Sequence, residues 1–209
     1  MLRTARSAAA FVLLAGLSGA VAAAADEKMP ASTYYPLSVG DTWNYRAGDN
    51  RFQLKVTEVK TVEGKPRAKV ELLVSGKPVS FEQVGVTKDG VVRYTFEGKE
   101  AKPPIEFLKL PPKADASWKI DSEVIDPKGG KFPVKGTLKA GKEEDVTVPA
   151  GKFKAVSVSG QDIDANGVKV QRLTYYFVER LGMVKQVIEL DSQKIIIELE
   201  KFEQGTPAK

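Results

Sequence analysis

The sequence contains neither cysteine nor histidine. Without cysteine there are no disulfide bonds, so core packing alone must stabilise the fold. Without histidine, the Ser-His-Asp and Cys-His mechanisms of nucleophilic catalysis are excluded. Zinc, copper and iron sites also lose their usual nitrogen and sulfur ligands. We therefore expect no metal and no other cofactor.

Motifs of other catalytic classes are missing as well. The chain has no Ser-x-x-Lys, no Gly-x-Ser-x-Gly and no Gly-x-Gly-x-x-Gly. The dipeptide Gly-Lys recurs six times, but serine or threonine never follows it, so there is no phosphate-binding P-loop. The sequence therefore assigns no catalytic, cofactor-binding or metal-binding residue, and we predict that the protein is not an enzyme.

Long apolar runs are absent except at the start of the chain. Arg3 and Arg6 precede an apolar stretch, Ala8–Leu17, and a small-residue stretch, Ser18–Ala25. This order predicts a signal peptide over Met1–Ala25, and a membrane anchor kept in the mature protein is the alternative. No later run reaches the ~20 residues of a transmembrane helix, and no cysteine is present to carry a lipid. We expect a soluble protein in the periplasm or outside the cell.

No segment of the sequence contains a cluster of basic residues or a long cluster of acidic ones. The chain has 32 basic and 27 acidic residues and a formal charge of +5, and the two signs are spread evenly. A nucleic-acid-binding surface needs clustered cations, so we expect no nucleic-acid partner. The sequence gives no information on the oligomeric state.

The rest of the chain has the composition of short antiparallel strands. We predict a flexible arm over residues 26–33, one β-rich domain over 34–203 and a polar tail over 204–209. Apolar residues alternate with polar ones, as in Phe52–Thr57, and glycine turns follow at short intervals. Further strands are predicted at Ala68–Leu72, Val79–Val86, Val91–Phe96, Trp118–Ile125, Val134–Leu138, Phe153–Val158, Val168–Val178, Met183–Leu190 and Ile195–Phe202. The fold class is all-β: an antiparallel meander that forms a curved sheet, an open barrel or a sandwich.

Both tryptophans occur in similar windows. Pro36 precedes Trp43, and Pro111 precedes Trp118, by the same seven positions, with threonine or serine before each ring. Two related halves, 34–100 and 101–203, are one interpretation, and coincidence is the other. We expect both tryptophans to be buried. Prolines 103, 104, 111 and 112 predict an irregular segment over Ala101–Ala116.

Two acidic segments are candidates for calcium binding or for catalysis by carboxylates. Asp162–Gly167 matches the first half of a calcium loop, but Leu173 stands where the bidentate glutamate belongs. Asn166-Gly167 is also a strong hairpin signal, and we favour a turn over a weak calcium site. Glu143, Glu144 and Asp145 form the only acidic run, which we interpret as a solvated loop. A hydrolase that uses carboxylates alone on a polysaccharide stays as the alternative function.

Aromatic residues gather near Tyr34–Tyr45 and at Tyr175–Phe177. Such residues more often form a core than a ligand-stacking pocket, and we favour the core. Leu173–Val178 and Ile195–Ile197 are apolar on both faces, so a second apolar layer must cover one of them. A ligand is one candidate for that layer. We therefore expect a non-catalytic exported protein that binds an apolar or polymeric ligand or serves as an envelope component.

Three segments resemble a bacterial family of exported proteins of unknown function, the TapB-like group. Tyr35–Tyr45 (YPLSVGDTWNY) is similar to its YxPLxxGxxWxY opening, Val148–Val156 (VPAGKFKAV) to its VPAGxF segment, and Tyr175–Lys185 (YYFVERLGMVK) to its GxVK close. Leu110–Trp118 also fits, with Asp115 where that element has glycine. The resemblance implies an exported domain with a curved sheet or open barrel, similar to lipoprotein carriers, and it implies no activity.

Overall fold

The computed structural model describes residues 34–165, 167–191 and 193–205. The predicted signal peptide and arm therefore lie outside the described residues, as does Asn166. Every regular element in the described part is a β-strand. The strands are β1 (Thr42–Ala47), β2 (Asn50–Val62), β3 (Lys65–Val74), β4 (Lys77–Val86), β5 (Gly90–Phe96), β6 (Lys99–Lys109), β7 (Ser117–Ile125), β8 (Lys131–Val148), β9 (Gly151–Ala165), β10 (Val168–Val170), β11 (Arg172–Val178), β12 (Gly182–Leu190) and β13 (Gln193–Glu203).

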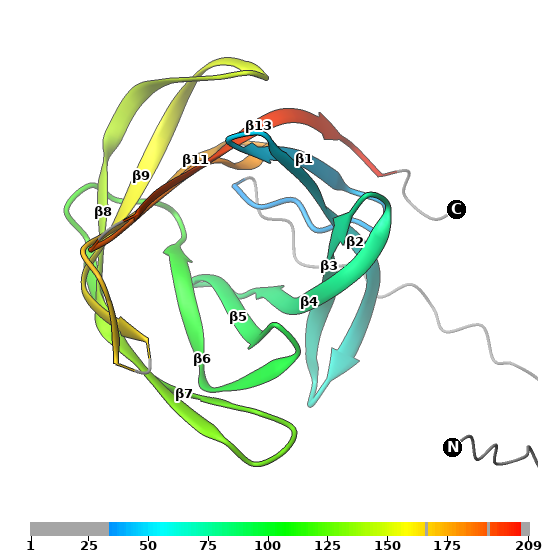
Figure 1. Cartoon of the computed structure of the whole chain (residues 1–209), viewed down its shortest axis with the longest axis vertical. Helices are drawn as coiled ribbons and strands as arrows, with labels where there is room; N and C mark the ends of the chain where they lie inside the picture. The colour runs from blue at the N-terminus through cyan, green and yellow to red at the C-terminus, as the bar shows by residue number, and fades with distance from the viewer. Residues whose placement is uncertain (1–33, 166, 192, 206–209) are drawn as a thin grey trace, which may run out of the picture.

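The strands form one antiparallel sheet that closes on itself. Strands that follow one another in the chain pair, except that β10 and β11 both pair with β9. In addition β13 pairs with β1, so that Phe202 lies opposite Trp43. The other junction is the long pairing of β8 with β9, and β9 in turn pairs with β11. Figure 1 shows the resulting ring, with β13 beside β1 and β8 beside β9. The predicted all-β antiparallel meander is confirmed, and its form is a closed barrel.

The predicted strand Val168–Val178 is divided in the structure. β10 and β11 lie in line along β9, and Gln171 separates them. Asp162 of β9 has a φ of 51° in the same region, which marks a bulge in the strand. Ala165 lies opposite Val168 in the pairing of β9 with β10, and Asn166 between them lies outside the described residues.

The prediction of an irregular segment over Ala101–Ala116 is wrong for its first half. Residues 101–109 belong to β6, where the pairing with β5 jumps from Glu100 opposite Thr95 to Ile105 opposite Arg93. Pro103 and Pro104 fall inside this jump. Proline has no N–H to donate, so it is tolerated where the ladder is already interrupted. Residues 110–116 are irregular as predicted.

The acidic run is part of a strand and not a loop. β8 continues through Gly141 and Lys142 with a register shift between Ala140 and Glu143. Glu143, Glu144 and Asp145 therefore stand exposed on the strand, and Asp145 Oδ1 lies 2.8 Å from Lys154 Nζ on β9. The prediction that these acidic side chains are exposed to solvent is confirmed. The predicted turn is wrong, because Gly141 lies in a bulge within the strand and does not end it.

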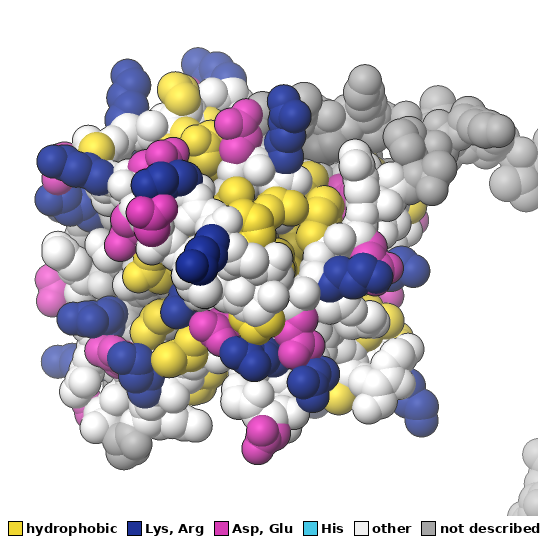
Figure 2. Space-filling model, turned by 90° about the horizontal axis from the view of Figure 1, so that it is seen from above, with side chains coloured by type: hydrophobic (Ala, Val, Ile, Leu, Met, Phe, Trp, Pro, Cys, Tyr) yellow, Lys and Arg dark blue, Asp and Glu magenta, His cyan; other side chains and the backbone are white. Residues whose placement is uncertain are grey.

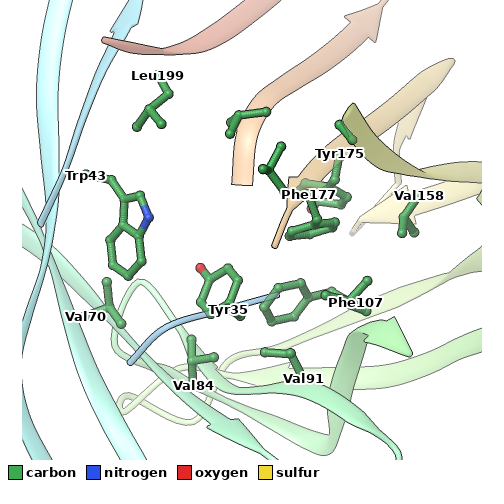
Figure 3. Close-up of a cluster of buried hydrophobic side chains, with 14 of the residues drawn as sticks. Tyr35, Trp43, Val70, Val84, Val91, Phe107, Val158, Tyr175, Phe177 and Leu199 are labelled. Atoms are coloured by element: carbon green, nitrogen blue, oxygen red, sulfur yellow. The ribbon is translucent and has the colours of Figure 1, made fainter. Parts of the chain in front are cut away.

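The segment before β1, residues 34–41, packs into the barrel and is called the plug. Tyr35 and Leu37 are buried within the main core cluster. The Tyr35 ring stacks on Trp43 at 5.9 Å and meets the edges of Phe107 at 5.4 Å and Phe177 at 6.2 Å. Figure 3 shows Tyr35 at the centre of this cluster, with Trp43 and Phe107 on opposite sides. The aromatic clusters of the sequence thus supply much of the core.

The two tryptophans have different environments. Trp43 is buried, as predicted, and its Nε1 donates to the carbonyl of Leu181 at 2.6 Å. Trp118 is only half-buried, so that part of the prediction is wrong. It lies where β6 and β7 separate after three paired residues, and its Nε1 donates to the carbonyl of Glu106 at 2.8 Å. The prediction of two related halves stays a prediction.

Candidate functional site

A cavity of about 740 Å³ lies inside the barrel, and every strand except β1 contributes to its wall. Most lining side chains are apolar, among them Phe52, Leu54, Leu72, Phe132, Leu173 and Ile188. Ligand pockets in proteins measure about 300–1,000 Å³ and have mainly apolar walls with a few polar groups. The size and lining of this cavity therefore suit one small ligand.

The alternation of side chains along each strand builds the wall. Leu54 of β2 lies opposite Leu72 of β3, and Leu173 of β11 lies opposite Ile188 of β12. Cross-strand partners share one face of a sheet, so each pair points into the barrel. These side chains are only half-buried because part of their surface faces the cavity. The cavity is thus the space inside the barrel that the inward-pointing side chains of the strands leave unfilled.

Tyr35 forms part of the cavity wall from the side of the plug. Burial raises the pKa of Tyr35, with a smaller contribution in the same direction from Glu82. The phenol therefore stays protonated at all physiological pH values. Tyr35 therefore belongs both to the buried core cluster and to the wall of the cavity.

An ion pair stands in the otherwise apolar wall. Arg93 Nε donates to Glu82 Oε2 at 2.5 Å, and the two side chains are 18% and 13% exposed. The guanidinium also lies 4.9 Å from the centre of the Phe107 ring. Burial lowers the pKa of Arg93, but Glu82, Tyr175 and Tyr35 together raise it by more, so that the net direction is upward. Arg93 therefore carries its charge inside the barrel.

A second, smaller cavity of about 90 Å³ adjoins the first. Arg93, Phe107, Leu173 and Tyr175 line both. The guanidinium of Arg93 and the ring of Tyr175 consequently stand between the two spaces.

The sequence-based candidates lie elsewhere. The carboxylates of Glu143, Glu144 and Asp145 are exposed and do not line the cavity. In the predicted calcium segment, Asp164 Oδ1 accepts the backbone N–H of Gly167 at 2.6 Å, which is a turn contact. Among the described residues, no group of three or more acidic side chains is placed to hold a metal ion. The choice between turn and weak calcium site stays a prediction, because Asn166 lies outside those residues.

Sequence reasoning missed the Glu82–Arg93 pair. Alternation did not reveal it, because buried residues of both parities lie nearby: Val91 and Tyr94 on β5, and Val84 and Gly85 on β4. A charged residue at an inward position of an alternating strand indicates a buried partner or a binding site. Both residues lie within strands that the sequence did predict.

The outer surface is mixed in charge. Figure 2 shows lysines and arginines interspersed with aspartates and glutamates on one face, with hydrophobic groups between them. The ion pairs of the described residues are distributed along the barrel in the same way, as in Arg51–Glu200 and Lys139–Asp115. Among the described residues, no helix has the length and apolar character needed to cross a membrane.

Comparison with known proteins yields structural similarity only. No family model and no curated protein matches the sequence. A crystal structure of a predicted lipoprotein from Parabacteroides distasonis is similar, with a TM-score of 0.51, 12% identity, and coverage of 83% of this chain and 100% of that one. A predicted exported protein with YmcC-like fold from Bacteroides fragilis gives a TM-score of 0.43 and 10% identity over the same shares. The first similarity shows a shared fold.

Proposed function

We propose that this chain is an exported, non-catalytic binding protein that encloses one apolar or amphiphilic ligand in its barrel. The observation that carries the proposal is the cavity of about 740 Å³ with its predominantly apolar wall. Water in such a space gains few hydrogen bonds, so a ligand that displaces it gains the free energy of apolar burial. The predicted signal peptide supports export.

A site inside the barrel favours a small ligand over a polymer. The wall includes residues from strands all around the barrel, so a ligand inside it is surrounded by protein. A long polysaccharide chain needs an open cleft that lets the polymer continue on both sides. Of the two ligands expected from the sequence, apolar or polymeric, we therefore propose the apolar one.

The carboxylate-only hydrolase has weaker support. Such an enzyme needs two carboxyl groups that face each other across the substrate, one of them protonated. Two glutamates line the cavity, and each has a cation beside it: Glu82 pairs with Arg93, and Glu97 with Lys99 at 3.3 Å. Neither residue stands as an unpaired carboxyl group in an apolar pocket, which is the usual environment of a catalytic acid.

The test is the binding of the fluorescent apolar probe 1-N-phenylnaphthylamine to the purified mature protein. We expect saturable binding at one site per chain. Leu72→Trp places a large ring in the cavity and should weaken binding at least tenfold. Leu73→Trp is the matched control, because Leu73 follows Leu72 on β3, does not line the cavity, and pairs with Gln53 on the outer face. It should leave binding unchanged.

The opposite results contradict the proposal. If the folded protein does not bind the probe, or if Leu72→Trp and Leu73→Trp have equal effects, the cavity is not a ligand site. The remaining interpretation is then a structural component of the cell envelope. Far-ultraviolet circular dichroism of each variant checks that its strands have formed.

A further inference from the structure

The charges that line the cavity balance. Arg93 and Glu82 form one pair deep in the wall, and Lys99 and Glu97 form a second, more exposed pair. No other charged side chain of the described residues lines this space. The site therefore offers no net charge to a ligand, although it contains a guanidinium and a carboxylate.

The deep pair keeps unused hydrogen-bonding capacity. A guanidinium has five N–H donors, and among the described residues only the Nε–H of Arg93 is donated, to Glu82 Oε2. Within the same part of the chain, the Nη groups of Arg93, Oε1 of Glu82 and the hydroxyl of Tyr175 make no hydrogen bond. Arg93, Glu82 and Tyr175 all line the cavity. Donors and acceptors thus lie side by side at one point of an apolar wall.

A charged ligand fits this arrangement poorly. A carboxylate beside Arg93 would add a second negative charge next to Glu82, and an ammonium group would add a second positive one. A charge that is buried without a counter-charge is strongly unfavourable. A neutral hydroxyl group has no such cost, since it accepts from an Nη group and donates to Glu82 Oε1.

We propose that the ligand is a single-chain amphiphile with an uncharged, hydroxyl-bearing head group, the chemistry of a monoacylglycerol. The head group binds at Arg93, Glu82 and Tyr175, and the chain extends between Leu54, Leu72 and Ile188. This inference rests on the proposed function, because it requires that the cavity binds a ligand. Beyond that function, we infer that the Glu82–Arg93 ion pair favours ligands with an uncharged head group over charged ones.

The first experiment compares head groups on one chain. Monooleoylglycerol, oleate and oleylamine are each used to displace 1-N-phenylnaphthylamine at pH 8, below their aggregation concentrations. We expect monooleoylglycerol to compete at least tenfold more tightly than either charged ligand. Oleate or oleylamine binding as tightly as monooleoylglycerol would overturn the inference and leave the proposed function intact. Absence of probe binding to the wild-type protein overturns both.

The second experiment changes the charge balance. Glu82→Gln leaves the guanidinium without its counter-charge, so oleate should gain at least tenfold over the wild type and become the preferred ligand. Glu97→Gln is the matched control, because it removes a lining carboxylate from the more exposed pair, and oleate affinity should change less than threefold. An equal gain of oleate in both variants would overturn the inference.

A double variant keeps the test decisive if Glu82→Gln alone does not fold. Glu82→Gln with Arg93→Gln removes both charges and restores neutrality, so monooleoylglycerol should again bind more tightly than oleate. A preference of the double variant for oleate would contradict a neutral-head-group site. Circular dichroism and a thermal unfolding curve establish that each variant is folded before its affinities are compared.

Discussion

The carboxylate of Asp41 accepts a hydrogen bond from the backbone N–H of Gly205, 164 positions away in the sequence, at 2.8 Å. The same carboxylate accepts the backbone N–H of Ser38 at 2.7 Å. Asp41 is buried, and so is Gly205. One side chain thus fixes the plug at the start of the barrel to the segment that follows its last strand.

Asp41→Ala should lower the free energy of unfolding by about 2 kcal/mol or more. The substitution removes the acceptor of a buried N–H group, that of Gly205, and of a part-buried one, that of Ser38. Each buried group left unsatisfied costs about 1–3 kcal/mol. Urea denaturation measures the change. Asp49→Ala is the control, since Asp49 is exposed in the turn before β2, and it should change stability by about 0.5 kcal/mol at most. Equal effects of both substitutions would show that the Asp41 contacts do not stabilise the fold.

Asp41 also predicts a pH dependence of stability. Burial raises the pKa of Asp41, and the hydrogen bonds from Gly205 and Ser38 lower it by less, so its net direction is upward. A carboxyl group whose pKa is raised in the folded state contributes stability below its unfolded pKa of about 3.9. That contribution is lost as the pH rises through the folded pKa. The stability of the wild type relative to Asp41→Asn should therefore fall between pH 4 and pH 7, as urea denaturation across this range will show.

A rise of the relative stability over that interval would contradict the direction of the pKa shift. The comparison with Asp41→Asn is needed because other carboxyl groups, whose pKa is lowered in the folded state, make the protein more stable as the pH rises. Lys194 lowers the pKa of Glu189, and the lower pKa of Glu198 reflects its contacts with Arg46 and Lys185, which outweigh its burial. These groups are present in both proteins, so their contributions cancel.

Tyr35→Ala should lower the free energy of unfolding by about 3–5 kcal/mol, the cost of removing a buried aromatic ring from a core. The ring contacts Trp43, Phe107 and Phe177. Phe96→Ala provides the control, because Phe96 is 45% exposed although it also lines the cavity; it should cost far less. A loss below about 1 kcal/mol for Tyr35→Ala would mean that the plug does not stabilise the barrel.

Ser122→Ala should loosen the region where β6 and β7 separate. Ser122 Oγ donates to the carbonyl of Pro103 at 2.7 Å, next to the three residues of β6 that pair with β7. Loss of this bond should lower stability by about 1 kcal/mol and speed amide hydrogen exchange in β6 and β7. Lys119→Ala, at an exposed position of β7, should leave both unchanged. Unaltered amide exchange in Ser122→Ala would show that the backbone pairing of β6 with β7 holds the two strands together without this side-chain bond.

Calcium should not affect the stability of the protein. The segment Asp162–Gly167 lacks the bidentate glutamate of a calcium loop, since Leu173 occupies that position and lies in the cavity wall. The thermal midpoint should be the same in calcium chloride and in EGTA. A midpoint several degrees lower in EGTA would establish a calcium site at this hairpin.

The short-range features were predictable because they depend on local patterns. Period-2 alternation and glycine turns identified the strands, and Asn166-Gly167 identified the hairpin between β9 and β10. Gly40 and Asp115, each three positions before a tryptophan, both have positive φ, at 93° and 65°. The two tryptophan windows therefore share a turn conformation, as their similar sequences suggested. Backbone conformation at a turn is set by the residues in it.

Local rules failed where strand pairing decided the outcome. Pro103 and Pro104 argued against a strand, yet β6 accommodates them at a break in its ladder with β5. Gly141 and Lys142 resembled a turn, yet β8 passes through them because its pairing with β9 continues on both sides. Whether a proline or glycine ends a strand depends on which backbone groups the neighbouring strand offers, and the sequence of one strand does not contain that information.

The sequence by itself determined the strand composition and the absence of histidine and cysteine chemistry. Only the tertiary structure decided that the sheet closes between β13 and β1, that Tyr35 packs inside the barrel, and that Glu82 and Arg93 meet in the wall of the cavity. The physical reason is that side-chain direction follows from local alternation. The curvature of the sheet, and hence the volume that inward side chains leave empty, depends on the register of every strand pair around the barrel.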